Sequence, residues 1–322
     1  MKSLIVPIVA AAVASAAPAV ALAQAAFPSK TITIVVPTAA GGGNDAMART
    51  IGQKLARLLG QTLIIDNRAG ANGSIASEFV ARAVPDGHTL MLGYIATHSM
   101  NPALQKLKYD PVADFEPVGL VGYSPTLMVA NAAVAVKDVK DLVAQLKAKP
   151  DKYTYASAGN GTAPHFAAEL FKLNAGVVML GVPYKGSAPA VSDTIGGQTQ
   201  FMFPSLFTAL PHVKSGKLKA LAVTTEQRSQ ALPDVPAVSE TLKGFAVDTW
   251  WGLVAPAGTP RDVVSKLHLA FVAALNSAEA KTRFATLMAE PVASTPEQFA
   301  AFMKNELAKY EKVVKASGAK VD

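Results

Sequence analysis

Two glycine-rich turns carry the residues of this chain that are best suited to bind an anion. The first runs from Thr38 to Asp45, after the β-rich run of residues 31–36, and the second runs from Ser157 to Thr162, after residues 153–156. Each turn leads into a segment with helical periodicity. A helix that begins there exposes its first backbone N–H groups, and its dipole adds partial positive charge. The two turns predict one acidic ligand held between two lobes, or else two unrelated loops of similar composition.

The first turn also fits the glycine pattern of dinucleotide-binding proteins. Gly41-x-Gly43-x-x-Ala46 is followed by Asp66 at the end of the next predicted strand. Three observations oppose this interpretation: the chain is predicted to be exported, Asp45 puts a carboxylate where the pyrophosphate would lie, and the second turn is left without a role. An NAD-dependent oxidoreductase is therefore kept only as an outside alternative.

Other catalytic chemistry has little support in the sequence. Ser157 and His165 flank the second turn, but the segment lacks the G-x-S-x-G pattern of a nucleophilic serine. His165 either donates a hydrogen bond into the cleft or packs there. The chain contains no cysteine. The other histidines do not show the spacing of metal ligands: His88, His98, His212 and His268. We expect a protein that is not an enzyme and that holds no metal and no cofactor.

The first 25 residues are typical of a secretory signal peptide. Lys2 precedes an almost unbroken apolar run over residues 4–22, and small residues follow at positions suited to cleavage after Ala23 or Ala25. Removal of this segment lowers the formal net charge of +7 by one. The remaining basic residues are dispersed, which does not favour nucleic-acid binding. We expect an exported, soluble and monomeric protein.

Short β-rich runs alternate with amphipathic helices along the chain, which is typical of parallel sheets with helices on both faces. The first half predicts strands over 31–36, 62–65 and 89–92, with helices over 46–59 and 75–83. The same alternation recurs between residues 153 and 223. We therefore predict an α/β fold with two lobes, each a mainly parallel sheet flanked by helices.

The chain is predicted to cross between the lobes twice, within residues 122–131 and 235–249. Two crossings imply a hinge and a cleft, and ligands in such sheets bind beyond the carboxyl ends of the strands. The predicted division is a signal peptide over 1–25, lobe 1 over 26–125 with 247–322, and lobe 2 over 126–246.

The last third is predicted to be mostly helical. Thr259-Pro260 and Thr295-Pro296 each place a capping hydroxyl before a proline at the first helical position, and Gln298 completes a capping box. These helices are expected to pack on the first lobe.

A series of ordered motifs resembles the receptor proteins of tripartite tricarboxylate transporters, the Bug family. The resemblance covers nearly the whole mature chain and is far more specific than one glycine loop. Its motifs include Val35-Val36-Pro37, Gly41-Gly42 with Asp45, Asp66-Asn67-Arg68-x-Gly70-Ala71-x-Gly73, Pro85-Asp86-Gly87, Asn101-Pro102, Tyr109-Asp110-Pro111, Tyr155-Ala156-Ser157, Gly159-Asn160-Gly161-Thr162, Val182-Pro183-Tyr184-Lys185-Gly186, Leu232-Pro233-Asp234-Val235-Pro236 and Ala255-Pro256-Ala257-Gly258-Thr259-Pro260.

The resemblance implies a periplasmic two-lobed binding protein of the type II-like, Venus-flytrap kind. Such a protein closes over a small carboxylate and delivers it to a membrane permease. A second possibility is a signalling role, in which a membrane sensor kinase recognises the loaded protein. In similar proteins the turn corresponding to residues 38–44 holds one carboxylate, partly through water, and residues 157–162 with His165 close from the other lobe.

The predicted site combines these positions with polar residues near the cleft. Thr97 and Ser99 follow the third strand, and Asp45 and Pro204 are expected to support the site. The predicted ligand-binding residues are Thr38, Ala40, Gly41, Gly42, Asn44, Thr97, Ser99, Ser157, Asn160, Gly161, Thr162, His165, Lys185 and Ser205. Capping of turns by Thr38, Thr97 and Ser99, pairing of Asp45 with Arg49, and a solvated Lys185 are the structural alternatives.

Two departures from the family pattern bear on the ligand. Many members have an aromatic residue where this chain has Thr38, and an acidic residue where it continues Pro204-Ser205. Loss of the acid removes a partner suited to an ammonium group. We therefore expect an aromatic or aliphatic mono- or dicarboxylate without an amino group, with Ser205 available to a distal oxygen.

Overall fold

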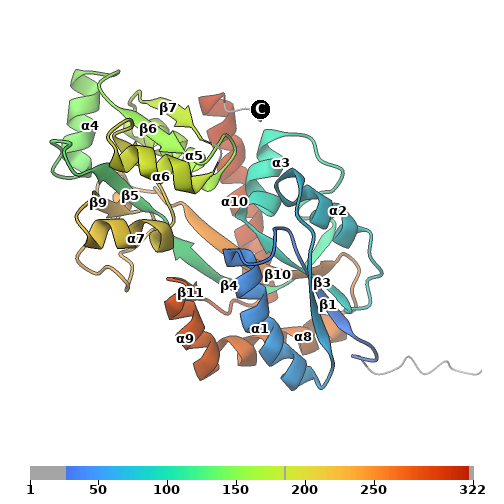
Figure 1. Cartoon of the computed structure of the whole chain (residues 1–322). Helices are drawn as coiled ribbons and strands as arrows, with labels where there is room; N and C mark the ends of the chain where they lie inside the picture. Colours follow the sequence, from blue (N-terminus) through green and yellow to red (C-terminus); the bar gives the residue numbers. More distant parts are fainter. Residues whose placement is uncertain (1–26, 185, 319–322) are drawn as a thin grey trace, which may run out of the picture.

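The computed structural model describes residues 27–184 and 186–318. Within them the chain forms two α/β lobes, with the long helix α10 (Pro296–Ser317) lying along both (Figure 1). The predicted signal peptide and Lys185 lie outside these residues. In the described part of the chain, no helix is long and apolar enough to cross a membrane.

The first lobe is built on a six-stranded sheet in the order β11-β4-β10-β3-β1-β2. Helices α1 and α8 cover one face, where they bury the side chains of Ile34 and Leu253, and α2 and α10 cover the other, where Val35 and Val254 are buried. Further helical segments are η1 (Ala71–Gly73), η2 (Ala96–Met100), α3 (Asn101–Leu104) and α9 (Ala278–Thr286). The main elements are β1 (Ile32–Val36), α1 (Gly43–Leu59), β2 (Leu63–Asn67), α2 (Ser74–Ala81), β3 (Thr89–Tyr94), β4 (Phe115–Pro125), β10 (Asp248–Pro256), α8 (Arg261–Leu275) and β11 (Glu290–Pro291).

The second lobe is built on a five-stranded sheet in the order β7-β6-β8-β5-β9. Helices α4 and α5 pack on one face, where Phe203 is buried, and α6 and α7 pack on the other, against Met202. The elements are β5 (Leu127–Asn131), α4 (Val139–Ala148), β6 (Thr154–Ser157), α5 (Ala163–Ala175), β7 (Leu180–Pro183), α6 (Ser187–Ile195), β8 (Phe201–Met202), α7 (Leu206–Lys214), β9 (Leu218–Val223) and the short η3 (Val238–Glu240).

The predicted α/β fold is confirmed, but the sheets are mixed rather than mainly parallel. Parallel pairing joins β1 with β2 and β3, and β6 with β7 and β8. The strands next to the crossings, β4, β5, β9 and β10, pair antiparallel with their neighbours. The chain passes from one sheet to the other between β4 and β5 and between β9 and β10, so these strands lie at the crossings.

Two buried threonines join the segments where the chain changes sheets. Thr126 lies between β4 and β5, and Thr224 follows β9. Their hydroxyl groups hydrogen bond to each other. The Thr224 hydroxyl also lies 2.6 Å from the carbonyl oxygen of Val247, the residue before β10, and the Thr126 hydroxyl lies 3.2 Å from the same oxygen. The exact boundaries of the lobes, at residues 126 and 247, stay a prediction.

The two predicted helix caps have different outcomes. Thr295 caps α10 in a capping box with Gln298, as predicted. Thr259 does not cap α8, because its hydroxyl donates to the carbonyl oxygen of Pro256 at 2.7 Å and closes the turn after β10. The C-terminal helices also reach beyond the first lobe, because the Tyr310 ring of α10 packs on Phe166 of α5 at 5.0 Å.

Replacement of Thr224 by valine should destabilise the protein by about 1–2 kcal/mol, because it removes a buried hydroxyl at nearly constant volume. The matched control is Thr286→Val, whose exposed hydroxyl donates within helix α9. Urea unfolding of both variants measures the difference. An equal change in the two variants would contradict a stabilising role of the buried threonine pair.

Candidate anion-binding site at the ends of the strands

The first glycine turn is held in shape by Asp45. Its Oδ2 accepts the backbone N–H of Gly41 at 2.9 Å and the Nε–H of Arg49 at 3.0 Å. The hydrogen bond from Arg49 is the main reason that the pKa of this carboxyl lies below its ordinary value. Gly41 has φ +85°, which favours glycine. Asp45 therefore pairs with Arg49 and fixes the turn, and the N–H of Gly41 is already used within it.

Helix α1 begins at Gly43, directly after this turn. The first N–H groups of a helix lack partners within it, so the backbone here offers donors at the positive end of the dipole. Ala40 and Gly42 are exposed, whereas Asn44 is buried. The Oδ1 of Asn44 accepts the indole N–H of Trp251 on β10 at 2.5 Å. Sequence reasoning missed Trp251, because 207 residues separate the pair.

Three loops of the first lobe converge beside this turn. A Cβ added at Gly73, which follows β2, would lie 2.6 Å from Thr97 Cγ2 and 2.9 Å from Pro37 Cβ. Asn67 Nδ2 donates to the carbonyl oxygen of Thr38 at 3.1 Å. The Oγ1 of Thr38 is buried and lacks a hydrogen-bond partner among the described residues. That hydroxyl is consequently unused within the described part of the lobe, and it is shut off from solvent.

The segment after β3 buries several polar side chains. The hydroxyl of Thr97 contacts both backbone groups of Tyr94 and the Nδ1 of His98, so it is used locally. Burial lowers the pKa of His98 to about 3, which keeps its ring neutral. Ser99 Oγ and Asn101 Oδ1 are buried and have no partner in the described part of the chain. In the sequence, Asn101 belongs to the motif Asn101-Pro102 of the family resemblance, and no local pattern indicates that it is buried.

The second glycine turn is stabilised by its own side chains. The Thr162 hydroxyl donates to the carbonyl oxygen of Gly159 at 2.7 Å, and Ser157 Oγ accepts the N–H of Gly159 at 3.4 Å. His165 Nδ1 accepts the N–H of Gly161 at 3.2 Å. A neutral His165 ring must therefore carry its proton on Nε2, where it is a donor. Asn160 lies in the same turn and is half-buried.

Two remaining predicted positions lie on the second lobe. Ser205 caps helix α7, since its Oγ accepts the N–H of Thr208 at 3.3 Å and hydrogen bonds to the Thr208 hydroxyl at 2.7 Å. The carbonyl oxygen of Pro204 accepts the N–H of Leu127 at 2.8 Å, next to the crossing. Lys185 lies outside the described residues. The contact of these positions with ligand stays a prediction.

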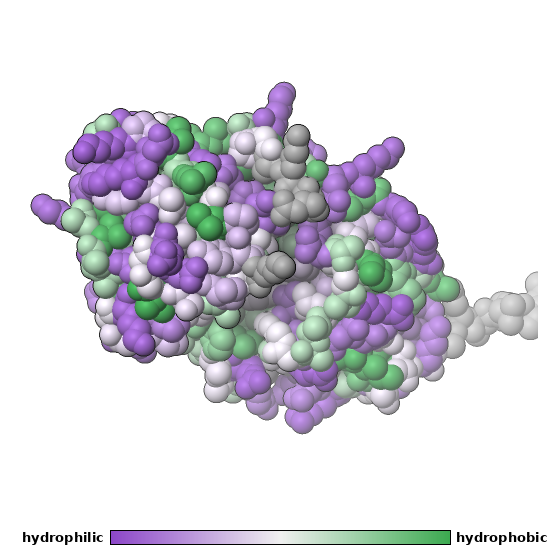
Figure 2. Space-filling view, turned by 45° about the horizontal axis from the view of Figure 1, so that its top comes forward, coloured by the Kyte–Doolittle hydropathy of each residue, from purple (hydrophilic) through white to green (hydrophobic). Residues whose placement is uncertain are grey.

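The second turn approaches the first lobe at Gly161. A Cβ added at Gly161 would lie 3.0 Å from Leu104 Cδ1 of α3. The surface is hollowed between the two lobes (Figure 2). The loops that follow β1, β2 and β3 therefore form one wall of polar groups, and the second turn contacts the end of that wall at α3.

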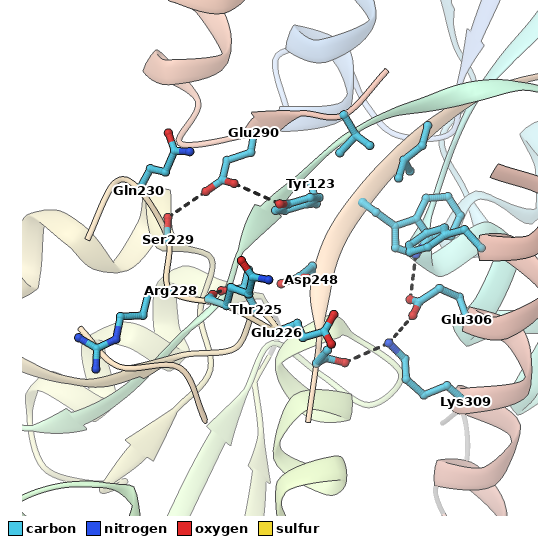
Figure 3. Close-up of a pocket in the computed structure, with 16 residues that line it drawn as sticks. Tyr123, Thr225, Glu226, Arg228, Ser229, Gln230, Asp248, Glu290, Glu306 and Lys309 are labelled. Carbon is cyan, nitrogen blue, oxygen red and sulfur yellow. Dashed lines mark hydrogen bonds and ion pairs between the residues drawn. The ribbon is translucent and has the colours of Figure 1, made fainter. Parts of the chain in front are cut away.

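A cavity of about 540 Å³ lies at the crossing (Figure 3). Loop 225–230 from the second lobe lines one side, and β4, β10, β11 and α10 line the other. Glu290 bridges the two sides, because it accepts hydrogen bonds from Tyr123 at 3.1 Å and Ser229 at 3.2 Å. Glu306 accepts the indole N–H of Trp250 at 3.1 Å and pairs with Lys309.

Asp248 is the most perturbed carboxyl in this cavity. Its Oδ1 is shut off from solvent and has no hydrogen-bond partner among residues 27–184 and 186–318. Burial raises its pKa to about 7, with Lys309 opposing the rise and Glu306, Glu290 and Glu226 adding to it. The ionised form of Asp248 is therefore disfavoured in the folded protein.

The structure adds no residue that favours dinucleotide binding or metal binding among those it describes. Asp66 accepts the Nε–H of Arg68 at 2.7 Å. Among the described residues, no cluster of three or more histidine, cysteine, aspartate or glutamate side chains could hold a metal ion.

Solved structures with the same arrangement place the chain in a class. The periplasmic binding protein BugD is 36% identical, with a TM-score of 0.73 over 92% of this chain and 100% of its own. Rpa4515 of R. palustris, solved with adipate, is 33% identical, with a TM-score of 0.76 and the same coverage. MatC of Rhodopseudomonas palustris, solved with bound malate, is 37% identical, with a TM-score of 0.73 over 89% of this chain and 100% of its own. The fold is that of a two-lobed periplasmic binding protein.

The family follows from the sequence match. Residues 47–319 match the model of the tripartite tricarboxylate transporter family receptor. The chain belongs to this family, and the resemblance to Bug proteins is confirmed. It is a solute-binding receptor and not an enzyme, which removes the NAD-dependent oxidoreductase from consideration.

Asp248→Asn should make the protein more stable at pH 8 than the unchanged chain, by about 1–3 kcal/mol. Between pH 4 and pH 7 the unfolded Asp248 releases its proton while the folded one keeps it, so this group lowers stability as pH rises toward 7. The advantage of the variant should therefore shrink toward pH 4. Urea unfolding at pH 4.5, 6 and 8 measures it, with the exposed Asp151→Asn as control. A gain that does not vary with pH would contradict the raised pKa.

Proposed function

We propose that this receptor captures a small carboxylate without an amino group between its two lobes. The capture takes place in the periplasm, after removal of the signal peptide, and the loaded receptor delivers the acid to a permease of the tripartite tricarboxylate type. Family membership supports a permease as the partner. The adipate and malate bound by two relatives support a small carboxylate as the ligand. Both of these acids lack an amino group.

The observation that carries the proposal is the pair of helix N-termini, one on each lobe. Helices α1 and α5 each begin at the end of a glycine-containing turn that follows a strand, and both are long enough to contribute a dipole. Backbone N–H groups and the Nε2–H of His165 are donors suited to carboxylate oxygens. Such a site binds an anion without a buried counter-charge, and bridging waters adapt it to acids of different length.

The distribution of negative charge argues against an amino group on the ligand. Oδ2 of Asp45 is occupied by Gly41 and Arg49, and its Oδ1 is shut off from solvent. Ser205 cannot offer a negative charge. An ammonium group in this cleft would lose its hydration without gaining an ionic partner, which costs free energy.

A thermal-shift screen of the mature chain should show stabilisation by one class of carboxylate. At a concentration of about 100 times its Kd, a ligand adds about 2.7 kcal/mol, which raises Tm by roughly 5 °C or more for a chain of this size. Two matched pairs test the amino group: malate against aspartate, and adipate against 2-aminoadipate. In each pair the acid without the amino group should give the larger shift. Tighter binding of the amino acids would contradict the proposed ligand class.

His165→Leu should weaken binding of the best acid by about 10-fold or more, because it removes one charge-assisted hydrogen bond and the acceptor of the Gly161 N–H. His212→Leu is the matched control, since His212 lies on α7 of the same lobe, outside the turn. Isothermal calorimetry gives both Kd values. Equal affinities in the two variants would show that His165 does not contact the ligand.

A further inference from the structure

The two tryptophans of the chain are neighbours on β10, and they point to opposite faces of the sheet. The indole of Trp250 donates to Glu306 on α10, and that of Trp251 donates to Asn44 on α1. Trp251 is 6% exposed and Asn44 is 8% exposed. The second hydrogen bond therefore connects a buried strand of the first lobe to the second residue of the helix that begins at the glycine turn.

The chemistry of the indole determines how the Asn44 amide is oriented. An indole N–H can only donate, so the amide atom that faces it must be the oxygen. The orientation of an asparagine amide is otherwise ambiguous, and here a donor-only partner resolves it. The Nδ2 group, with its two N–H donors, consequently points away from Trp251.

The remaining contacts of Asn44 indicate where these donors are available. Nδ2 has no hydrogen-bond partner in residues 27–184 and 186–318. A buried atom without a partner would be one of the unsatisfied buried polar atoms, and Nδ2 is not one of them. It therefore reaches solvent at the start of α1, beside the first backbone N–H groups of that helix. With Asp45 Oδ2 occupied, the polar groups presented at this helix end are mainly donors.

We propose that Trp251 is a positioning residue for carboxylate binding: its indole N–H holds the Asn44 amide so that both Nδ2 hydrogens are presented to the ligand. This inference rests on the proposed function, since it assigns donors to the same anion site. Without the indole, the amide can rotate by half a turn and present its oxygen, which repels a carboxylate. The effect of Trp251 on affinity is thus transmitted entirely through Asn44.

The place of Trp251 in the fold makes this hydrogen bond rigid. Trp251 pairs with Tyr94 of β3 on one side and Gly122 of β4 on the other, so the strand cannot shift alone. The strand begins one residue after Val247, whose carbonyl oxygen accepts the hydroxyl groups of the threonine pair. The donor that orients Asn44 is therefore anchored to the crossing about which the lobes would move.

The test compares phenylalanine variants of the two tryptophans, which each lose one indole N–H from the same strand. Kd is measured by calorimetry for adipate, malate and the acid with the largest shift in the thermal screen. Trp251→Phe should weaken binding about 5- to 20-fold, as loss of a hydrogen bond to a charged group does, and Trp250→Phe by less than twofold. Circular dichroism and Tm verify that both variants fold.

Variants of Asn44 separate positioning from a general effect on structure. Asn44→Ala should weaken binding at least as much as Trp251→Phe, and the double variant should be no weaker than Asn44→Ala alone. Asn44→Asp keeps an acceptor for the indole but replaces the donors with a charged oxygen, so it should weaken binding about 100-fold or more. In the ligand-free protein, Asn44→Ala should speed hydrogen exchange of one indole N–H and leave the other unchanged.

The outcomes distinguish the inference from the function on which it rests. Equal affinities of the two phenylalanine variants, or additive losses in the double variant, would overturn the positioning role while leaving the receptor function intact. An unchanged protein that binds none of the acids would overturn the proposed function itself. Unchanged exchange of both indole protons in Asn44→Ala would show that the hydrogen bond is absent in solution.

Discussion

The buried hydrogen bonds between Thr126, Thr224 and Val247 are the constraint on which the rest of the structure depends. They join both crossings of the chain at one point, so the two sheets cannot separate independently. The strands beside this point must run antiparallel to their neighbours, which makes both sheets mixed. The parallel strands β1, β3 and β6 then end near the crossing, and their turns carry the polar groups of the site.

The candidate site offers hydrogen-bond donors to the proposed anion without a cluster of cations. Asp45 uses its charge to shape the first turn and is neutralised by Arg49, while Thr162 and His165 shape the second turn. What each turn presents to a ligand is then set by backbone N–H groups and by the amide of Asn44. Donors of this kind are fixed by the fold, so the protein loses little conformational entropy when a ligand binds.

Opposite sides of strand β10 have different chemistry. On the face towards α1, Trp251 donates to the neutral Asn44, and the neighbouring helix end is rich in donors. On the face towards α10, Trp250 donates to Glu306 in the cavity that also contains Asp248, whose ionised form is disfavoured by burial. The same side-chain type therefore hydrogen bonds to a neutral amide on one face and to a carboxyl group on the other.

The sequence by itself determined the strand–turn–helix units, the glycine turns and the family, because local periodicity, backbone conformation and short motifs act over a few residues. It also predicted the capping box of α10, in which Thr295 and Gln298 are three residues apart. Only the tertiary structure decided which polar groups are already used, such as the hydroxyls of Thr97 and Ser205, and which lack a partner among the described residues, such as Thr38 Oγ1. It also decided the partners of Asn44 and Thr126 and the raised pKa of Asp248. These depend on sheet register and on burial by segments up to 207 residues away, which no local pattern encodes.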